Sequence, residues 1–265
     1  MKKFIVANWK MNPNTIQEAE GLLGGVLDGA PKLKSTDIIF CPPFVYLDRL
    51  SKMMTLNPKP YTLNPKLGAQ DIFWENKGSY TGEISASMLK NLGVKYVIVG
   101  HSERRRDLNE TNEMINKKIK FALGNNLKVI FCVGEEKRDG EGRYLKFIKK
   151  EVVDGLEKIP KKELNNLIIC YEPVWAISSP RLRSGQAQKG PDTPDDFLQT
   201  SIYIRRVLFF KFGVKIARQT PILYGGSVDA KNARGFLEEG RARGLLVGRA
   251  SWKVSTFEDL LKNIQ

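Results

Sequence analysis

The chain has 265 residues, of which 42% are hydrophobic, and a formal net charge of +14. This apolar content is enough for a large core and excludes a disordered chain. No run of about 18 apolar residues is present, so we expect no membrane-spanning helix. The apolar run after the N-terminal lysines, Phe4 to Ala7, is shorter than the roughly 7–15 residues of a secretory signal, so we expect a cytoplasmic protein.

The positive charge has two interpretations. Basic runs such as "KFIKKEVVDGLEKIPKKEL" would supply contacts to nucleic-acid phosphates. The interpretation that we favour is a set of solvated helix faces in a basic protein. The positive field would also steer a small anionic substrate toward the protein.

The cysteines and the single histidine argue against disulfides and zinc. Cys41, Cys132 and Cys170 each lie in an apolar run, which favours buried reduced thiols. His101 is the one histidine and no Cys-x-x-Cys pair is present, so we expect no metal site.

Short β-rich runs recur along the chain, and helical patterns separate them. The runs are mostly continuous in apolar residues, which is typical of covered parallel strands, and they span residues 4–9, 37–42, 66–71, 96–101, 128–134, 167–173, 221–227 and 244–250. Residues 110–126 have the pattern of an amphipathic helix that ends at Gly124-Asn125. Residues 255–264 have the pattern of a second helix, with Ser255 or Thr256 as its N-cap. This alternation predicts an α/β protein, a single (β/α)₈ barrel domain over residues 1–265. An open doubly wound sheet is disfavoured, since no G-x-G-x-x-G follows the first run.

Chemically useful residues follow several of these strands. The first run ends with Asn8 and Lys10, the fourth with His101 and Glu103, and the sixth with Glu172. Each alone has an ordinary explanation, such as a solvated lysine, a hydrogen-bonded histidine or a loop charge. In a barrel all of them would face one mouth, where the active sites of this fold lie.

Such a set fits proton abstraction beside a carbonyl group in a phosphorylated substrate. A carboxylate would take the proton, a neutral imidazole would hydrogen-bond the carbonyl oxygen, and an ammonium group would stabilise the developing charge. The glycines after the seventh and eighth runs, in "YGGS" and "VGRA", would let backbone N–H groups approach the phosphate. This chemistry needs no metal and no organic cofactor.

Several motifs carry a family resemblance over essentially the whole chain. They are, in order, "ANWKMN", "GAQD", "TGEIS", "VIVGHSERR", "CVGE", "YEPVWAI", "LYGGSV" and "LVGRAS". With them the chain resembles the triosephosphate isomerase family, itself a standard worked example of a carboxylate base paired with a neutral imidazole. The resemblance implies the cofactor-free interconversion of dihydroxyacetone phosphate and D-glyceraldehyde 3-phosphate through an enediolate, a step of glycolysis and gluconeogenesis.

The resemblance also implies residue roles. Glu172 matches the general base, and His101 the electrophile, whose charge a helix N-terminus suppresses. Lys10 and Asn8 match residues that contact substrate, and Glu103 matches an acidic residue whose role is positional.

Further positions match the phosphate site, the lid and the subunit interface. Ser178, Ser227, Gly248 and Arg249 match phosphate-binding positions, and the loop over about 173–192 matches a lid that starts at Trp175 and Ala176. The family is usually a homodimer, in which Thr81 would insert into the partner. The neighbouring Tyr80, with Phe73 and Trp74, is typical of an interface.

The chain departs from the family pattern at three places. The usual "QN" is Gln70-Asp71, which adds a charge near the interface loop. After the eighth run, where the family usually has Gly-Gly, this chain has Gly248-Arg249. The backbone of Arg249 would be strained if this position required a positive φ. Where the lid of the family reads "AIGTGK", this chain reads "AISSPR", which places Pro180 at the tip of the lid. The segment that follows is longer by about nine residues, and Gly185 and Gly190 in it are candidate hinges.

Two other functions remain alternatives. A different phosphate-substrate isomerase or aldolase-like enzyme would need another base or a Schiff-base lysine, and no strand centre carries a lysine. A basic, catalytically impaired barrel that binds nucleic acid would not be expected to keep Asn8, Lys10, His101 and Glu172. We therefore expect a triose phosphate and a second copy of the chain as partners, with no nucleic acid and no membrane.

Overall fold

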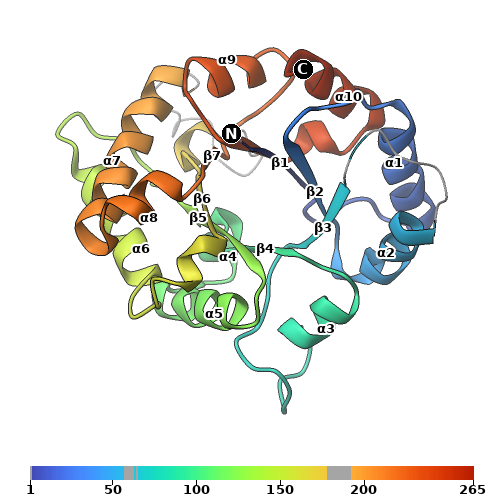
Figure 1. The fold of residues 1–265 in the computed structure, drawn as a ribbon, viewed down its shortest axis with the longest axis horizontal. Coiled ribbons are helices and arrows are strands. Elements are labelled where there is room, and N and C mark those ends of the chain that lie inside the picture. The colour runs from blue at the N-terminus through green and yellow to red at the C-terminus, as the bar shows by residue number, and fades with distance from the viewer. Residues whose placement is uncertain (1, 57–62, 64, 178–191) are drawn as a thin grey trace.

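In this computed structural model the chain is described over residues 2–56, 63, 65–177 and 192–265. Eight strands follow one another around a closed barrel in chain order, and each pairs in parallel with the next, β8 returning to β1. The helices form a ring outside the strands (Figure 1). The predicted (β/α)₈ barrel is therefore confirmed.

The strands are β1 (Lys3–Asn8), β2 (Thr36–Cys41), β3 (Pro65–Ala69), β4 (Tyr96–Val99), β5 (Lys128–Val133), β6 (Leu167–Tyr171), β7 (Ile222–Tyr224) and β8 (Gly244–Val247). The α-helices are α1 (Ile16–Gly29), α2 (Leu47–Leu56), α3 (Ala86–Asn91), α4 (Ser102–Asp107), α5 (Asn112–Gly124), α6 (Arg143–Gly155), α7 (Pro194–Phe212), α8 (Val214–Gln219), α9 (Ala233–Glu238) and α10 (Val254–Asn263). Short 3₁₀ turns are η1 (Phe44–Tyr46), η2 (Glu163–Asn166), η3 (Val174–Ala176) and η4 (Arg249–Ser251).

Both faces of the strands are buried, which explains the continuous apolar runs. One set of alternating side chains fills the barrel interior: Phe4, Val6, Ile39, Cys41, Tyr96, Ile98, Ile130, Cys132, Ile168, Cys170, Leu223 and Leu246. The other set packs against the apolar faces of the helices. The three cysteines are free and buried, as predicted.

The helix predicted in the middle of the chain is confirmed, and the prediction for the last helix was partly wrong. The helix predicted over 110–126 is α5, with Thr111 as its cap. The cap predicted at Ser255 or Thr256 is wrong, because α10 begins at Val254 after Lys253. The Thr256 hydroxyl instead donates to the carbonyl oxygens of Ala250 and Lys253, inside the first turn. Among the described residues no helix is both long and apolar enough to cross a membrane.

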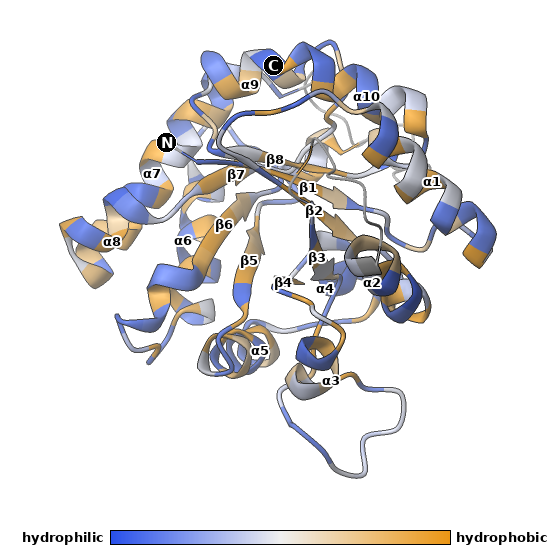
Figure 2. Cartoon of the chain, turned by 45° about the vertical axis from the view of Figure 1, so that its right-hand side comes forward, coloured by the Kyte–Doolittle hydropathy of each residue, from blue (hydrophilic) through white to orange (hydrophobic). Residues whose placement is uncertain are grey.

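The loop between β3 and α3 extends away from the barrel, as Figure 2 shows beside α3. Its aromatic residues contact one another: the rings of Phe73 and Trp74 are stacked with centroids 4.2 Å apart, and the Tyr80 ring lies 4.7 Å from Phe73. The loop therefore carries its own small aromatic cluster, with Tyr80 46% exposed.

Gly244 allows β8 to close the barrel against β1. A Cβ atom there would lie 1.9 Å from the carbonyl oxygen of Phe4, and a backbone atom cannot move aside without disturbing the β1–β8 pairing. We expect Gly244→Ala to lower the free energy of unfolding by at least about 1–3 kcal/mol, as measured by denaturant titration. Gly21→Ala is the matched control: nothing lies within 4 Å of its Cβ position, and an alanine in helix α1 should stabilise by about 0.5–1 kcal/mol. Equal stability of the two variants would contradict the close-approach argument.

Candidate active site

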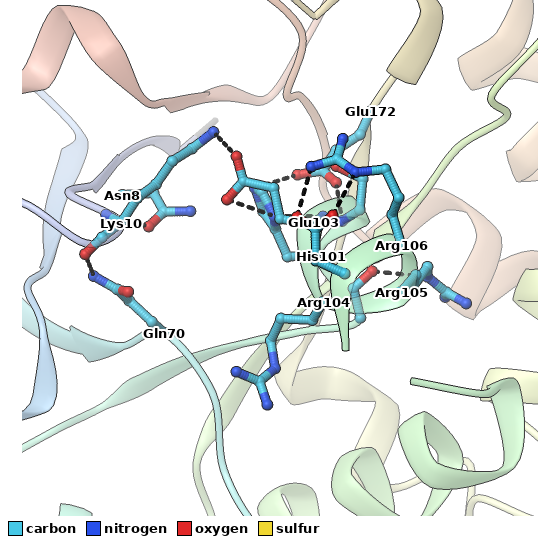
Figure 3. Close-up of polar contacts among 12 residues, drawn as sticks. Asn8, Lys10, Gln70, His101, Glu103, Arg104, Arg105, Arg106 and Glu172 are labelled. Atoms are coloured by element: carbon cyan, nitrogen blue, oxygen red, sulfur yellow. Dashed lines mark hydrogen bonds and ion pairs between the residues drawn. The ribbon is translucent and has the colours of Figure 1, made fainter. Parts of the chain in front are cut away.

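Lys10 is held in an unusual backbone conformation at the end of β1. Its φ is 55°, a region that residues other than glycine seldom adopt. Its N–H donates to Asn8 Oδ1 at 3.0 Å, and the Gln70 amide donates to the Lys10 carbonyl at 2.8 Å. The side chain then reaches across the mouth, where Nζ lies 2.6 Å from Glu103 Oε1 (Figure 3).

His101 stands at the N-terminus of α4, as the sequence predicts. It is the residue before the helix, and its Nδ1 accepts a hydrogen bond from the Glu103 N–H at 3.3 Å. Since Nδ1 is an acceptor, the proton of the neutral imidazole lies on Nε2, which faces Glu172. Burial alone would raise the pKa of Glu103, but its interactions with His101 and Lys10 outweigh burial and lower it.

Glu172 is a buried carboxylate, and only one of its two oxygens accepts a hydrogen bond from a backbone N–H group. The residue is 1% exposed, and Oε2 accepts the Ser102 N–H at 2.9 Å from the first turn of α4. Oε1 lies 3.2 Å from His101 Nε2, but the alignment is not that of a hydrogen bond. Within the described part of the chain, Oε1 therefore has no N–H or O–H donor, and the thiol of Cys132 adds a weak hydrogen bond to the carboxylate. A carboxylate in this state is ready to accept a proton from something placed in the mouth.

The start of the predicted lid is anchored to the barrel. One oxygen of Glu135 accepts both the Tyr171 hydroxyl and the Trp175 indole N–H, each at 2.8 Å. The Ser227 hydroxyl donates to the Ala176 carbonyl at 3.1 Å. Trp175 and Ala176 are thus fixed between β6 and β7. Ser178, Pro180, Gly185 and Gly190, with the longer lid exit, lie outside the described residues.

The phosphate-binding candidates after β8 lie beside the lysine. A Cβ atom on Gly248 would be 3.3 Å from Lys10 Cε, so a side chain there would crowd the ammonium group. Arg249 begins the turn η4 and is not among the residues with positive φ. The strain that a positive φ would have imposed on this departure is therefore absent.

A network behind the mouth joins strands β4 and β5. Arg105 donates to the Gly100 carbonyl at 2.8 Å and lies 3.2 Å from Glu151 on α6. Glu151 accepts the Gly134 N–H at 2.8 Å, and a Cβ atom on Gly134 would lie 1.8 Å from the Glu172 carbonyl oxygen. The network therefore supports the backbone on which Glu172 rests. Burial raises the pKa of Glu151 to about 7, although Arg105 acts in the opposite direction.

The extra charge of Asp71 is matched inside the protein. Lys118 on α5 donates to both of its oxygens, at 2.8 and 2.6 Å, and Arg104 lies 2.8 Å away. Glu110 contacts the same two cations. Burial raises the pKa of Asp71 to about 6 against the charge of Lys118. Lys118 lies on the apolar face of α5 and is only 2% exposed, which no local pattern in the sequence predicts.

One group of described residues has the composition and spacing to surround a metal ion. Cys132 and Cys170 from the barrel interior lie beside Glu172, with their ligand atoms all within 4.8 Å of one another. The prediction of no metal site depended on the single histidine and on the absence of a Cys-x-x-Cys pair, and neither feature bears on ligands that come from neighbouring strands.

The barrel thus brings Asn8, Lys10, His101, Glu103 and Glu172 together at the carboxyl ends of its strands. This combination defines an enzyme of the (β/α)₈ class with an acid–base site. A sequence profile described as "Triosephosphate isomerase" matches residues 3–264. The triosephosphate isomerase of Dictyoglomus thermophilum is 41% identical over 263 residues, 99% of each chain. That of Alkaliphilus oremlandii is 41% identical over 258 residues, 97% of each chain. That of Aquifex aeolicus is 38% identical over 262 residues, 98% of this chain and 99% of its own. The chain belongs to the triosephosphate isomerase family.

The raised pKa of Glu151 predicts a pH-dependent stability. The folded protein keeps a proton on Glu151 up to about pH 7, whereas the ordinary value is 4.5, so the contribution of this group is lost as pH rises between these values. Glu151→Gln removes the titration and keeps an acceptor for the Gly134 N–H. We expect the stability of the variant relative to wild type to increase from pH 4.5 to 7, by on the order of 2–3 kcal/mol.

Thermal unfolding across this pH range measures the effect. The control is Glu157→Gln, which changes an exposed carboxyl group just after α6. Parallel curves for Glu151→Gln and wild type would show that Glu151 has the same pKa in the folded and unfolded chains.

Proposed function

We propose that this protein is an active triosephosphate isomerase, which interconverts dihydroxyacetone phosphate and D-glyceraldehyde 3-phosphate. The observation that carries the proposal is the Glu172 carboxylate, which is buried with one oxygen that lacks an N–H or O–H donor and lies 3.2 Å from His101 Nε2. Membership of the family supports the same reaction. The family match gives no support to the alternative of a catalytically impaired barrel that binds nucleic acid.

In the proposed reaction Glu172 takes a proton from the carbon next to the substrate carbonyl. The electron pair of that C–H bond moves toward the carbonyl oxygen and forms an enediolate. His101 donates a hydrogen bond from Nε2 to this oxygen, and the Lys10 ammonium group stabilises its negative charge. A proton then passes, by way of His101 Nε2, from the hydroxyl oxygen of the enediolate to the former carbonyl oxygen. Glu172 returns its proton to the carbon that carried the carbonyl group, and a new carbonyl group forms at the neighbouring carbon, which completes the isomerisation without a cofactor.

The remaining residues have supporting roles in this proposal. Asn8 fixes the Lys10 backbone through the hydrogen bond to its N–H, and Glu103 holds the ammonium group in the mouth. Gly248, Arg249 and Ser227 lie at the ends of β8 and β7, on the side where barrels of this class bind phosphate. Ser178 belongs to the same proposed phosphate site but lies outside the described residues.

Replacing the proposed base tests the function directly. Glu172→Gln keeps the size of the side chain and the acceptor for the Ser102 N–H but cannot take a proton. We expect kcat to fall by at least about 100-fold, the lower range for general-base catalysis, with a smaller change in KM. A coupled isomerase assay measures both constants.

Glu238→Gln, on the exposed surface of α9, is the matched control and should retain wild-type rates. Comparable rates for wild type and Glu172→Gln would remove Glu172 from the mechanism. A wild type without isomerase activity would refute the function itself.

We also propose that the protein is a cytoplasmic homodimer. The loops after β1, β2 and β3 expose large apolar side chains, with Met11 95%, Val45 79% and Tyr80 46% exposed. The third of these loops projects from the barrel beside α3 (Figure 2) and includes the exposed Thr81. Apolar and aromatic groups that project in this way are stabilised when a second copy covers them. Neither nucleic acid nor a membrane is among the partners that we propose.

A charge at position 81 in this loop should disrupt the dimer. Thr81→Arg would place an unpaired cation in the proposed interface, which costs about 2–5 kcal/mol of association free energy. We expect sedimentation to shift from dimer toward monomer and the specific activity to fall, since the resemblance places Thr81 near the lysine of the partner. Thr55→Arg, an exposed position on α2, is the control. A wild type that sediments as a fully active monomer would exclude the proposal.

A further inference from the structure

Two thiols lie directly beneath the Glu172 carboxylate, inside the barrel. Cys132 on β5 and Cys170 on β6 are register partners on neighbouring strands, and both belong to the interior set of side chains. Side chains on a strand alternate between faces, so Glu172, two residues after Cys170, follows on the same side. The three ligand atoms all lie within 4.8 Å of one another, and both cysteines are 0% exposed.

The spacing of these atoms suits a soft cation. Zinc–sulfur bonds are about 2.3 Å and zinc–oxygen bonds about 2.0–2.2 Å, so a tetrahedral ion holds two such ligand atoms roughly 3.5–3.8 Å apart. The three ligand atoms here lie within 4.8 Å of one another, so shifts of about 1 Å or less would bring them to that spacing. Thiolates select soft or borderline ions such as zinc, cadmium and copper(I) over magnesium and calcium.

A second observation points to a ligand at the same place. Glu172 is 1% exposed, its Oε1 has no N–H or O–H donor among the described residues, and the Cys132 thiol, a weak donor, hydrogen-bonds the carboxylate. A buried carboxylate oxygen without a strong donor is costly and is normally satisfied. A cation between Oε1 and the two sulfurs would satisfy it. The third interior cysteine, Cys41, is equally buried but lies outside this group.

We propose that Cys132, Cys170 and Glu172 form a binding site for a soft divalent cation of the zinc and cadmium class, and that the bound ion inhibits the enzyme. Binding releases the two thiol protons and forms two metal–thiolate bonds and one metal–carboxylate bond. No oxidant or reductant takes part. The inhibitory half of the proposal rests on the proposed function. Inhibition requires that Glu172 is the catalytic base and that the bound ion keeps it from accepting a proton.

Cadmium is the probe that tests the binding half without any assay of activity. Thiolate coordination gives an ultraviolet charge-transfer band, and the protein is kept reduced with a phosphine so that no added thiol competes for the ion. For the full chain we expect a band that saturates at one ion per chain, with protons released into unbuffered solution.

The variants assign the ligands. Cys170→Ala should weaken cadmium binding by at least about 100-fold, because losing a ligand costs more than losing an outer-shell partner, which costs roughly 10–100-fold. Cys132→Ser is a second variant in case the first fails to fold. Cys41→Ala, the matched control, should bind as wild type does. Circular dichroism confirms that each variant is folded.

Glu172→Gln should keep the band and bind about tenfold or more weakly, since the thiolates remain and the carboxylate is lost. The absence of a band in wild type, or an unchanged band in both Cys170→Ala and Cys132→Ser, would overturn the proposal. Wild-type isomerase activity should fall as the band grows and return when a chelator removes the ion. A band without isomerase activity would refute the proposed function alone, because the site itself would still be present.

Discussion

The structure of the mouth depends on burying the Glu172 carboxylate without satisfying it completely. Removing a carboxylate from water costs several kcal/mol unless donors replace the lost hydration. The chain supplies one full donor, the Ser102 N–H at the start of α4, and places His101 next to the other oxygen. This arrangement holds the side chain in place and still leaves Oε1 free to react. It also requires a helix to begin immediately after β4, which explains why His101 and Ser102 occur at that junction.

The same constraint explains the glycines and charges around the strand ends. Gly134 lets the end of β5 approach the Glu172 backbone, and Glu151 and Arg105 hold that segment from the helix side. Glu135 secures the following residues through Tyr171 and Trp175. Several buried carboxylates thus lie close together, and their mutual repulsion contributes to the raised pKa of Glu151, for which burial is the main cause. Each carboxylate thus holds a different strand end at the mouth.

Much of this arrangement could be predicted from the sequence, because the strongest signals are local. Continuous apolar runs located all the strands, and the residues just after them identified Lys10, His101 and Glu172 before any geometry was known. The cap of α10 could not be assigned from composition, since Thr256 and Ser255 lie within the first turn and bond backward to carbonyl groups. The pairing of Cys132 with Cys170 depends on the register between two strands, and the burial of Lys118 on contacts between α5 and the end of β3. Such long-range geometry leaves no local pattern in the chain.

Asp71 shows how such a long-range contact makes a departure from the family tolerable. A carboxylate at the end of β3 would be destabilising if it were buried alone, but Lys118 and Arg104 surround it and also bind Glu110. Two cations therefore face two carboxylates in one buried group, so the group as a whole carries no net charge. Arg104 belongs to α4, the helix that also supplies the Ser102 donor to Glu172. The charge of Asp71 near the start of the β3–α3 loop and the carboxylate in the mouth are thus both held by residues of the same short helix.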